Sequence, residues 1–327
     1  MRAHPARAVL TAVGVVVLGA LVGCAPVDDE STRVEGVVVS TNPELATDPG
    51  VPVLADIEYG AVDGQPLLLD ACMPPDFDPV ADAARAAIVV VHGGSWTRGS
   101  KNDIAWRAVC QWLARSGYPT FNVDYRLAPV NPYPAAIDDV AGAVEWLRED
   151  EQVTRFGIDP DRIGAFGGSA GGNLVSLLGT RSNGDLDRGS RVAAVVELSG
   201  PIDLTGVAVT DDFVPVQLSY LGCADAATCP AAAAASANTW IDETDPPFFV
   251  AHSTEEMIPI GQAELFVRAL RDAGIDTTFI SVSGTLHSIA MIDKPLKERI
   301  LDFYALTLAP KELPVEPATD DVDAAGP

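Results

Sequence analysis

The run Gly167-Gly168-Ser169-Ala170-Gly171 fits the pattern Gly-x-Ser-x-Gly. It follows the short apolar stretch 162–166, which predicts a strand, and it precedes 173–178, which begins a segment with helical spacing. Glycines on both sides of a serine allow a tight strand-to-helix turn, in which the serine hydroxyl points out of the sheet. The alternative is a glycine-rich turn that only opens a helix or forms an anion nest. The pattern is weak by itself, but its position between strand and helix favours Ser169 as an activated serine.

The same alternation of apolar stretches and helical segments extends along the chain. Buried parallel strands are predicted at residues 86–91, 118–123, 162–166, 193–198, 247–251 and 277–282. Helical spacing is found at residues 104–116, 134–149, 171–180, 260–273 and 296–306. We therefore expect an α/β fold with a mostly parallel, doubly wound sheet and helices on both faces. Residues 55–59 and 66–72 flank a turn signal and predict an antiparallel hairpin at one sheet edge.

A second glycine motif, His92-Gly93-Gly94, follows the predicted strand at 86–91. Small residues at such a strand end let backbone N–H groups point at a developing oxyanion, so Gly93, Gly94 and Ala170 are the candidate donors. A phosphate loop from Gly94 to Gly99 is excluded, because that loop requires Gly-Lys-Ser/Thr where this chain has Gly-Ser-Lys. His92 precedes the serine, and we expect it to brace the loop.

The general base is expected downstream of Ser169, because the chain order in this architecture is serine, acid, histidine. The two histidines there are His252, which ends a predicted strand, and His287, which lies in the loop after the last strand. We expect His287 to be the base and His252 to support the acid. For the acid the sequence favours Glu256, with Glu255 and Asp203 as alternatives, since any of these carboxylates could orient an imidazole.

Length and composition limit the classes of function. The chain has 327 residues, of which 48% are hydrophobic and 20% charged, as is ordinary for a globular protein. It carries 21 Lys and Arg against 46 Asp and Glu, a formal net charge of -25, which would repel a phosphate backbone. We expect no nucleic-acid partner.

The N-terminus predicts export. Arg2 and Arg7 precede an apolar run at 8–22 that is short for a membrane-spanning helix and ends in Gly23-Cys24. This ending resembles the lipobox of bacterial lipoproteins, in which the signal is cut before the cysteine and its sulfur is acylated. We expect a signal peptide at 1–23, acylation of Cys24, a flexible tether over 24–52, and a location at the outer face of a bacterial cell membrane.

The predicted catalytic domain spans 53–309, with a small cap-like insertion at 201–238 over the active site and a disordered acidic tail at 310–327. The four cysteines after Cys24 are Cys72, Cys110, Cys223 and Cys229, an even number in an exported chain. Three pairings are possible, and the short gap between Cys223 and Cys229 favours that bridge and leaves Cys72 with Cys110. No Cys or His spacing typical of a zinc site is present, so we expect no metal and no cofactor.

These motifs together resemble the α/β-hydrolase superfamily, in particular the hormone-sensitive-lipase-like carboxylesterases and the BD-FAE-like feruloyl-esterase group. Besides the two glycine motifs, the resemblance includes the runs 124–129 and 133–139, in the family's order. The family's loop after the seventh strand typically reads His-Gly-Thr-x-Asp, where this chain has His252-Ser253-Thr254-Glu255-Glu256. By that alignment Glu256 takes the Asp position. Two glycines followed by Ser95-Trp96, in place of three glycines, look more like the BD-FAE-like group.

Residues and resemblance together favour a serine carboxylester hydrolase that cleaves small to medium acyl esters through an acyl-enzyme, with Ser169, His287 and Glu256 as its triad. An amidase or peptidase with the same triad is the first alternative. The second is a surface-tethered binding protein on a hydrolase scaffold, which is suggested by Glu256 and Ser253 in place of the usual Asp and Gly. The oligomeric state is not indicated by the sequence.

Overall fold

The computed structural model describes residues 42–78, 84–206, 210–225 and 228–310. The predicted signal peptide, Cys24, most of the predicted tether and the acidic tail after residue 310 lie outside the described residues.

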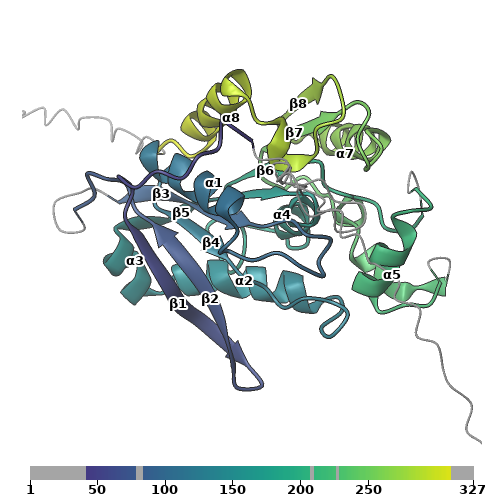
Figure 1. Ribbon diagram of the computed structural model, residues 1–327, viewed down its shortest axis with the longest axis horizontal. Coiled ribbons are helices and arrows are strands. Elements are labelled where there is room, and N and C mark those ends of the chain that lie inside the picture. The colour runs from purple at the N-terminus through teal and green to yellow at the C-terminus, as the bar shows by residue number, and fades with distance from the viewer. Residues whose placement is uncertain (1–41, 79–83, 207–209, 226–227, 311–327) are drawn as a thin grey trace, which may run out of the picture. The chain divides into compact units, whose positions relative to one another are not determined.

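A single eight-stranded sheet forms the centre of the molecule (Figure 1). Its strands are β1 (Val53–Val62), β2 (Gln65–Cys72), β3 (Arg85–Val91), β4 (Thr120–Val123), β5 (Ile158–Gly168), β6 (Ala194–Leu198), β7 (Phe248–Ser253) and β8 (Thr277–Val282). The order across the sheet is β1-β2-β4-β3-β5-β6-β7-β8. The β1–β2 and β2–β4 pairs are antiparallel and all other pairs are parallel. The predicted hairpin at one edge and the predicted parallel strands are confirmed.

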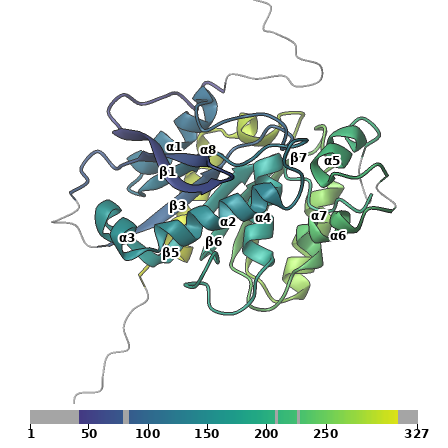
Figure 2. The same cartoon turned by 90° about the horizontal axis from the view of Figure 1, so that it is seen from below.

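Helices cover both faces of this sheet. They are α1 (Ile104–Arg115), α2 (Ala135–Leu147), α3 (Asp150–Phe156), α4 (Ala170–Thr180), α5 (Val214–Leu221), α6 (Pro230–Ala234), α7 (Gly261–Asp272) and α8 (Lys294–Thr307). Two 3-10 turns, η2 (Ala237–Thr239) and η3 (Ser288–Met291), complete the regular structure described. Helices α1 and α8 pack on one face, and α2, α3, α4 and α7 pack on the other, the face seen in Figure 2. In the described part of the chain, no helix combines the length and the apolar character needed to span a membrane.

Strand β3 shows how the sequence produces two cores. Its side chains alternate between the faces, so that Ala87 and Val89 join the core under α2 and α4, while Ile88 and Val90 join the core under α1 and α8. All four are fully buried. A strand covered on both faces has no polar side, which is why β3 reads as a continuous apolar run.

The segment 42–52 differs from the expectation of a flexible tether. The Asn42 side-chain amide donates hydrogen bonds of 2.8 Å to the carbonyl oxygens of Ile289 and Ile292, and Leu45 and Val51 are buried. The Asp48 N–H donates to the side-chain oxygen of Gln111 in α1. The folded domain therefore begins by Asn42 and not at residue 53, because these contacts bind the segment to α1 and to the loop before α8.

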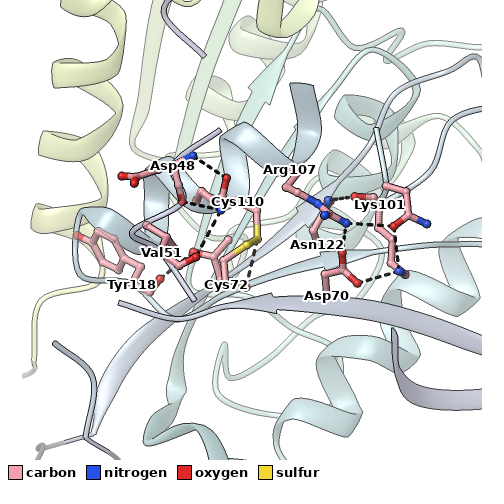
Figure 3. The surroundings of a disulfide bond; sticks show 12 residues. Asp48, Val51, Asp70, Cys72, Lys101, Arg107, Cys110, Tyr118 and Asn122 are labelled. Atoms are coloured by element: carbon pink, nitrogen blue, oxygen red, sulfur yellow. Dashed lines mark hydrogen bonds and ion pairs between the residues drawn. A yellow bond between two sulfur atoms is a disulfide. The ribbon is translucent and has the colours of Figure 1, made fainter. Parts of the chain in front are cut away.

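Both favoured disulfides are confirmed: Cys72 is bonded to Cys110 and Cys223 to Cys229. The first joins β2 to α1 in a fully buried position, and Figure 3 shows it beside a polar cluster of Asp70, Lys101 and Arg107. Lys101 Nζ lies 2.7 Å from one oxygen of Asp70, and Arg107 lies 3.0 Å from the other. This cluster fixes the loop between β3 and α1 to the hairpin.

The segment 201–238, predicted as an insertion, contains α5 and α6. Tyr220 of α5 stacks on Trp96 with ring centroids 4.1 Å apart and an interplanar angle of 4°. Phe213, at the start of α5, also contacts the Trp96 ring, with centroids 6.0 Å apart. Trp96 is fully buried and lies two residues after Gly94, the last residue of the second glycine motif. The insertion therefore packs directly on the loop of the candidate oxyanion hole.

Candidate active site

Ser169 lies at a sharp turn between β5 and α4. Its φ is +57°, a left-handed conformation that L-residues rarely adopt, and it caps the N-terminus of α4. The Ser169 N–H donates a 2.8 Å hydrogen bond to the carbonyl oxygen of Leu198 at the end of β6. The flanking glycines are required sterically, because a Cβ on Gly171 would clash with the carbonyl oxygen of Val91 and one on Gly167 with that of Gly171. The strand–turn–helix arrangement predicted from the motif is confirmed.

The second glycine motif lies against this turn. A Cβ on Gly93 would lie 3.2 Å from the Ser169 Cβ and 2.9 Å from the Gly168 carbonyl oxygen, so the two backbones are in close contact. Gly94 has a φ of +123°, and a Cβ there would clash with the carbonyl oxygen of Arg98. Ala170 follows the serine as the first residue of α4, where N–H groups have no partner within the helix. The backbones of Gly93 and Ala170 thus flank the side chain of Ser169.

His92 braces the loop of the second glycine motif, as expected. Its ring is buried and stacks on Tyr125 with centroids 4.3 Å apart, and the Tyr125 hydroxyl donates to the His92 carbonyl oxygen. Its Nδ1 lies 2.7 Å from the Gly93 carbonyl oxygen, an acceptor that requires the nitrogen to carry a proton. Burial lowers the pKa of His92 below its ordinary value, although the Gly93 carbonyl acts in the opposite direction. These contacts hold Gly93 in place.

His287 and Glu256 are in direct contact. Nδ1 of His287 donates to Oε2 of Glu256, whose side chain is completely buried, while the His287 side chain is 25% exposed. The loop after β7 provides Glu256 and the loop after β8 provides His287, and both strands end at the same edge of the sheet as β5. Of the three carboxylates weighed as the acid, Glu256 is the one that the structure brings to His287.

Neither of the other two candidate acids is hydrogen-bonded to His287 in the described part of the chain. Asp203 accepts hydrogen bonds from the backbone and the hydroxyl of Thr205, at 2.8 and 2.6 Å. Glu255 is exposed, and its N–H donates to the Gly284 carbonyl oxygen. Asp203 therefore stabilises its own loop, whereas the backbone of Glu255 joins the loop after β7 to the loop after β8.

Two serines to which the sequence analysis gave no positioning role fix the backbone around His287. The Ser253 hydroxyl donates to the carbonyl oxygen of Leu286, and the Ser199 hydroxyl accepts a 2.9 Å hydrogen bond from the N–H of Ser288. They end β7 and follow β6, so the histidine is held between the two strand ends. Ser253 takes the place of the family's usual glycine, and that substitution was the one signal in the sequence for this contact.

Behind Glu256 lies a second histidine. His252 Nε2 lies 2.9 Å from Oε1 of Glu256 and 2.8 Å from the carbonyl oxygen of Ile258. The expected supporting role of His252 thus corresponds to a direct contact. A further buried carboxyl group, Glu197, interacts electrostatically with both residues. Sequence analysis missed Glu197, although an acidic residue inside the apolar stretch 193–198 was a visible signal.

The electrostatics of the site favour an ionised Glu256. Burial raises the pKa of its carboxyl group, but contacts with His252 and His287 outweigh burial, so that the pKa lies below its ordinary value. An ionised acid that accepts from Nδ1 of His287 leaves Nε2 of that ring free to take a proton. The arrangement can therefore activate a nucleophile near this ring. Within the described ranges no three His, Cys, Asp or Glu side chains gather as a metal site.

Comparison with known proteins shows which family this chain resembles and which of its residues match. The sequence model of the BD-FAE family matches residues 75–270, more than half of the chain. Esterase LipQ of Mycobacterium tuberculosis is 32% identical over 257 residues, which cover 76% of this chain and 59% of the relative. Probable carboxylic ester hydrolase LipM of the same organism is 33% identical over 66% of this chain and 51% of its own length. The chain thus spans between half and three fifths of these curated relatives.

A solved structure shares the architecture. Thermogutta terrifontis esterase 2, phosphonylated by sarin, superposes with a TM-score of 0.65 and 25% identity. The match covers 84% of this chain and all of that one.

Proposed function

The chain belongs to the BD-FAE family and has the α/β-hydrolase fold, and from this premise we propose that it is a serine carboxylester hydrolase. The observation that carries the proposal is the buried contact between Glu256 and His287, in loops at the same sheet edge as the strained turn of Ser169. Two relatives named as an esterase and as a probable carboxylic ester hydrolase support the ester as substrate.

Each residue has a defined role in this reaction. Ser169 Oγ attacks the acyl carbonyl carbon while Nε2 of His287 takes the hydroxyl proton. Glu256 keeps the ring in the required tautomer and stabilises the imidazolium that forms. Backbone N–H groups of Ala170, Gly93 and Gly94 stabilise the oxyanion. His287 then protonates the leaving alcohol, and water attacks the acyl-enzyme with the same ring as base.

The insertion is proposed to limit the acyl group to small and medium sizes. Trp96, two residues after Gly94, is completely buried under Tyr220 and Phe213, so aromatic rings of the insertion pack against the loop that would hold the oxyanion. A series of p-nitrophenyl esters of increasing acyl length tests this: kcat/KM should fall from acetate or butyrate towards long chains. A preference for long acyl chains would contradict it.

Glu256 and Ser253 replace the family's usual Asp and Gly, but their contacts in the structure do not support the alternative of a non-catalytic binding protein. Glu256 reaches His287 despite its extra methylene, and Ser253 holds the neighbouring Leu286 carbonyl. No described feature of this chain favours amide substrates over ester substrates. A parallel assay of an ester and its matching anilide separates the two, with the ester expected to react faster.

A fluorophosphonate probe tests the proposed mechanism, and its use is supported by the structural relative that is phosphonylated by sarin. We expect the probe to label Ser169 in the full-length protein, as located by peptide mass spectrometry. Ser169→Ala should lower kcat for p-nitrophenyl acetate by about 10⁶ while circular dichroism remains unchanged. Wild-type turnover in this variant, or a folded wild-type protein that the probe does not label, would exclude the mechanism.

We also propose that the chain is exported and anchored by acylation of Cys24 at the outer face of a bacterial membrane, on the basis of the basic start, the apolar run and its Gly-Cys ending. Metabolic labelling with a fatty acid should mark the wild type and not Cys24→Ser. Equal labelling of both proteins would refute this anchor.

A further inference from the structure

Three buried ionisable groups lie behind the His287 ring, and the proposed mechanism uses only one of them. Glu197, His252 and the side chain of Glu256 are completely buried. They come from β6, β7 and the loop after β7, and His287 faces them from the loop after β8. A buried carboxylate is costly unless an opposite charge or hydrogen bonds compensate it, so the protonation of this cluster bears on how Glu256 is held.

The tautomer of His252 follows from its neighbours. Nε2 lies 2.8 Å from the carbonyl oxygen of Ile258, which can only accept, so Nε2 carries a proton. This N–H is aligned on the carbonyl and not on Oε1 of Glu256, which receives no aligned hydrogen bond from the described residues. Oε1 nevertheless lies only 2.9 Å from Nε2. The contact between ring and carboxylate is therefore mainly one of charge.

Because Nε2 of His252 carries a proton, the ring is positively charged only when Nδ1 is protonated as well. Nδ1 of His252 is buried without a hydrogen-bond partner among the described residues, and so is Oε2 of Glu197. The other oxygen of Glu197 accepts from the N–H of Gly200. The parallel register aligns Glu197 with Val250 and Leu198 with Ala251, which places Glu197 and His252 on one face of neighbouring strands.

The balance of charges favours one distribution of protons. Burial raises the pKa of Glu197 to about 8, against the lowering effect of His252, so Glu197 is mostly neutral at pH 7. Burial lowers the pKa of His252, but the opposing effects, of which the contact with Glu256 gives the largest, outweigh burial, so the net shift is upward. If His252 is doubly protonated, one positive ring faces one negative carboxylate, and a neutral Glu197 adds no second buried negative charge.

Resting on the proposed function, we propose that His252 is a positioning residue: in its doubly protonated form it holds the inner oxygen of Glu256 by charge, with Glu197 protonated beside it, and so directs the outer oxygen to His287. The longer Glu side chain, with one more rotatable bond than the usual Asp, is thereby fixed at both oxygens.

The pH dependence of kcat/KM distinguishes this role from a merely structural one. In His252→Gln the amide can still donate to Ile258, but the positive charge is lost, so the Glu256–His287 pair binds its proton more tightly. We expect the acid limb of the kcat/KM profile to move up by about one pH unit, since a neighbouring charge within about 4–6 Å shifts a pKa by about 1–3 units. At the wild-type midpoint this corresponds to a rate about fivefold lower. A uniform drop without a shift of the limb would overturn the proposal.

Two further variants serve as matched tests. In Glu197→Gln, which mimics the protonated carboxyl group, the acid limb should stay in place; a downward shift would mean that Glu197 is ionised and would contradict the assigned protons. Glu255→Gln removes the exposed neighbouring carboxylate and should also leave the limb in place, which controls for a general charge effect.

A measurement without turnover separates this inference from the proposed function. In histidine-labelled wild-type protein, ¹⁵N NMR should show His252 protonated on both nitrogens at pH 7, and its titration should move to lower pH in Glu256→Gln. If the ester assays and the fluorophosphonate probe fail while this shift is observed, the proposed function fails and the charge contact stands. A neutral His252 at pH 7, or no shift in Glu256→Gln, would overturn the inference whatever the enzyme activity.

Discussion

The two sides of the active site are built differently. On the nucleophile side, residues 167–171 form one continuous strand–turn–helix unit, and close backbone contacts leave no room for side chains at Gly167 and Gly171. On the acid–base side, Glu256 and His287 belong to separate loops and meet directly through their side chains, while Ser253 at the end of β7 and Ser199 after β6 hold the backbone on either side of His287. Backbone sterics therefore place the serine, whereas side-chain hydrogen bonds and charges place the acid and the base.

This difference predicts how each side responds to substitution. A change on the nucleophile side should disturb folding and activity together, because the backbone that holds Ser169 is also the contact between β3 and α4. A change on the acid–base side should alter the rate while leaving most of the fold intact, since the loops lie at the edge of a complete sheet.

The largest effect is expected for Glu256→Gln. The amide keeps the size of the side chain, but it cannot stabilise the imidazolium and it can favour the wrong tautomer of His287. We expect kcat for p-nitrophenyl acetate to fall by about 10³–10⁴, while circular dichroism shows that the protein is still folded. The control Glu255→Gln should stay within about twofold, as is usual for an exposed substitution. Similar losses in both variants would mean that the contact with His287 does not select the acid.

A smaller loss of rate, with a loss of stability, is expected for Gly171→Ala. The new Cβ would clash with the carbonyl oxygen of Val91, a backbone atom that cannot move cheaply. We expect the free energy of unfolding to fall by about 1–3 kcal/mol, and kcat to fall by about 10² because Ser169 is displaced. Gly142→Ala in α2 is the matched control, since its Cβ would meet nothing within 4 Å; it should add about 0.5–1 kcal/mol of stability. Denaturant unfolding and esterase assays of both variants measure this, and a stable, active Gly171→Ala would show that backbone sterics do not place the serine.

The same division explains what could be predicted from sequence. The sheet, its edge hairpin and the turn at Ser169 depend on local patterns of apolar residues and glycines, and all were predicted. The choice among Glu255, Glu256 and Asp203 depends on which side chain reaches across from one loop to another, so the sequence favoured Glu256 without excluding the other two. Ser199 and Glu197 were missed because their roles depend on the register of β6 against β7. The packing of 42–52 was missed because its partners lie in α1 and before α8, far away in the chain.

The smallest expected effect that tests the difference between the nucleophile side and the acid–base side is that of Ser253→Gly, which restores the residue that the family usually carries. The Ser253 hydroxyl holds the Leu286 carbonyl next to His287, and a hydrogen bond of this kind contributes about 1 kcal/mol, so we expect kcat to fall about fivefold with KM unchanged. Ser283→Gly is the control, because Ser283 is exposed and lies in the loop of Leu286 and His287; its kcat should stay within about twofold of the wild type. A selective effect of Ser253→Gly on kcat would mean that a side chain from β7 sets the position of the base. If both variants behave like wild type, the backbone of the 284–288 loop positions His287 by itself, and the acid–base side would then obey the same rule as the turn at Ser169.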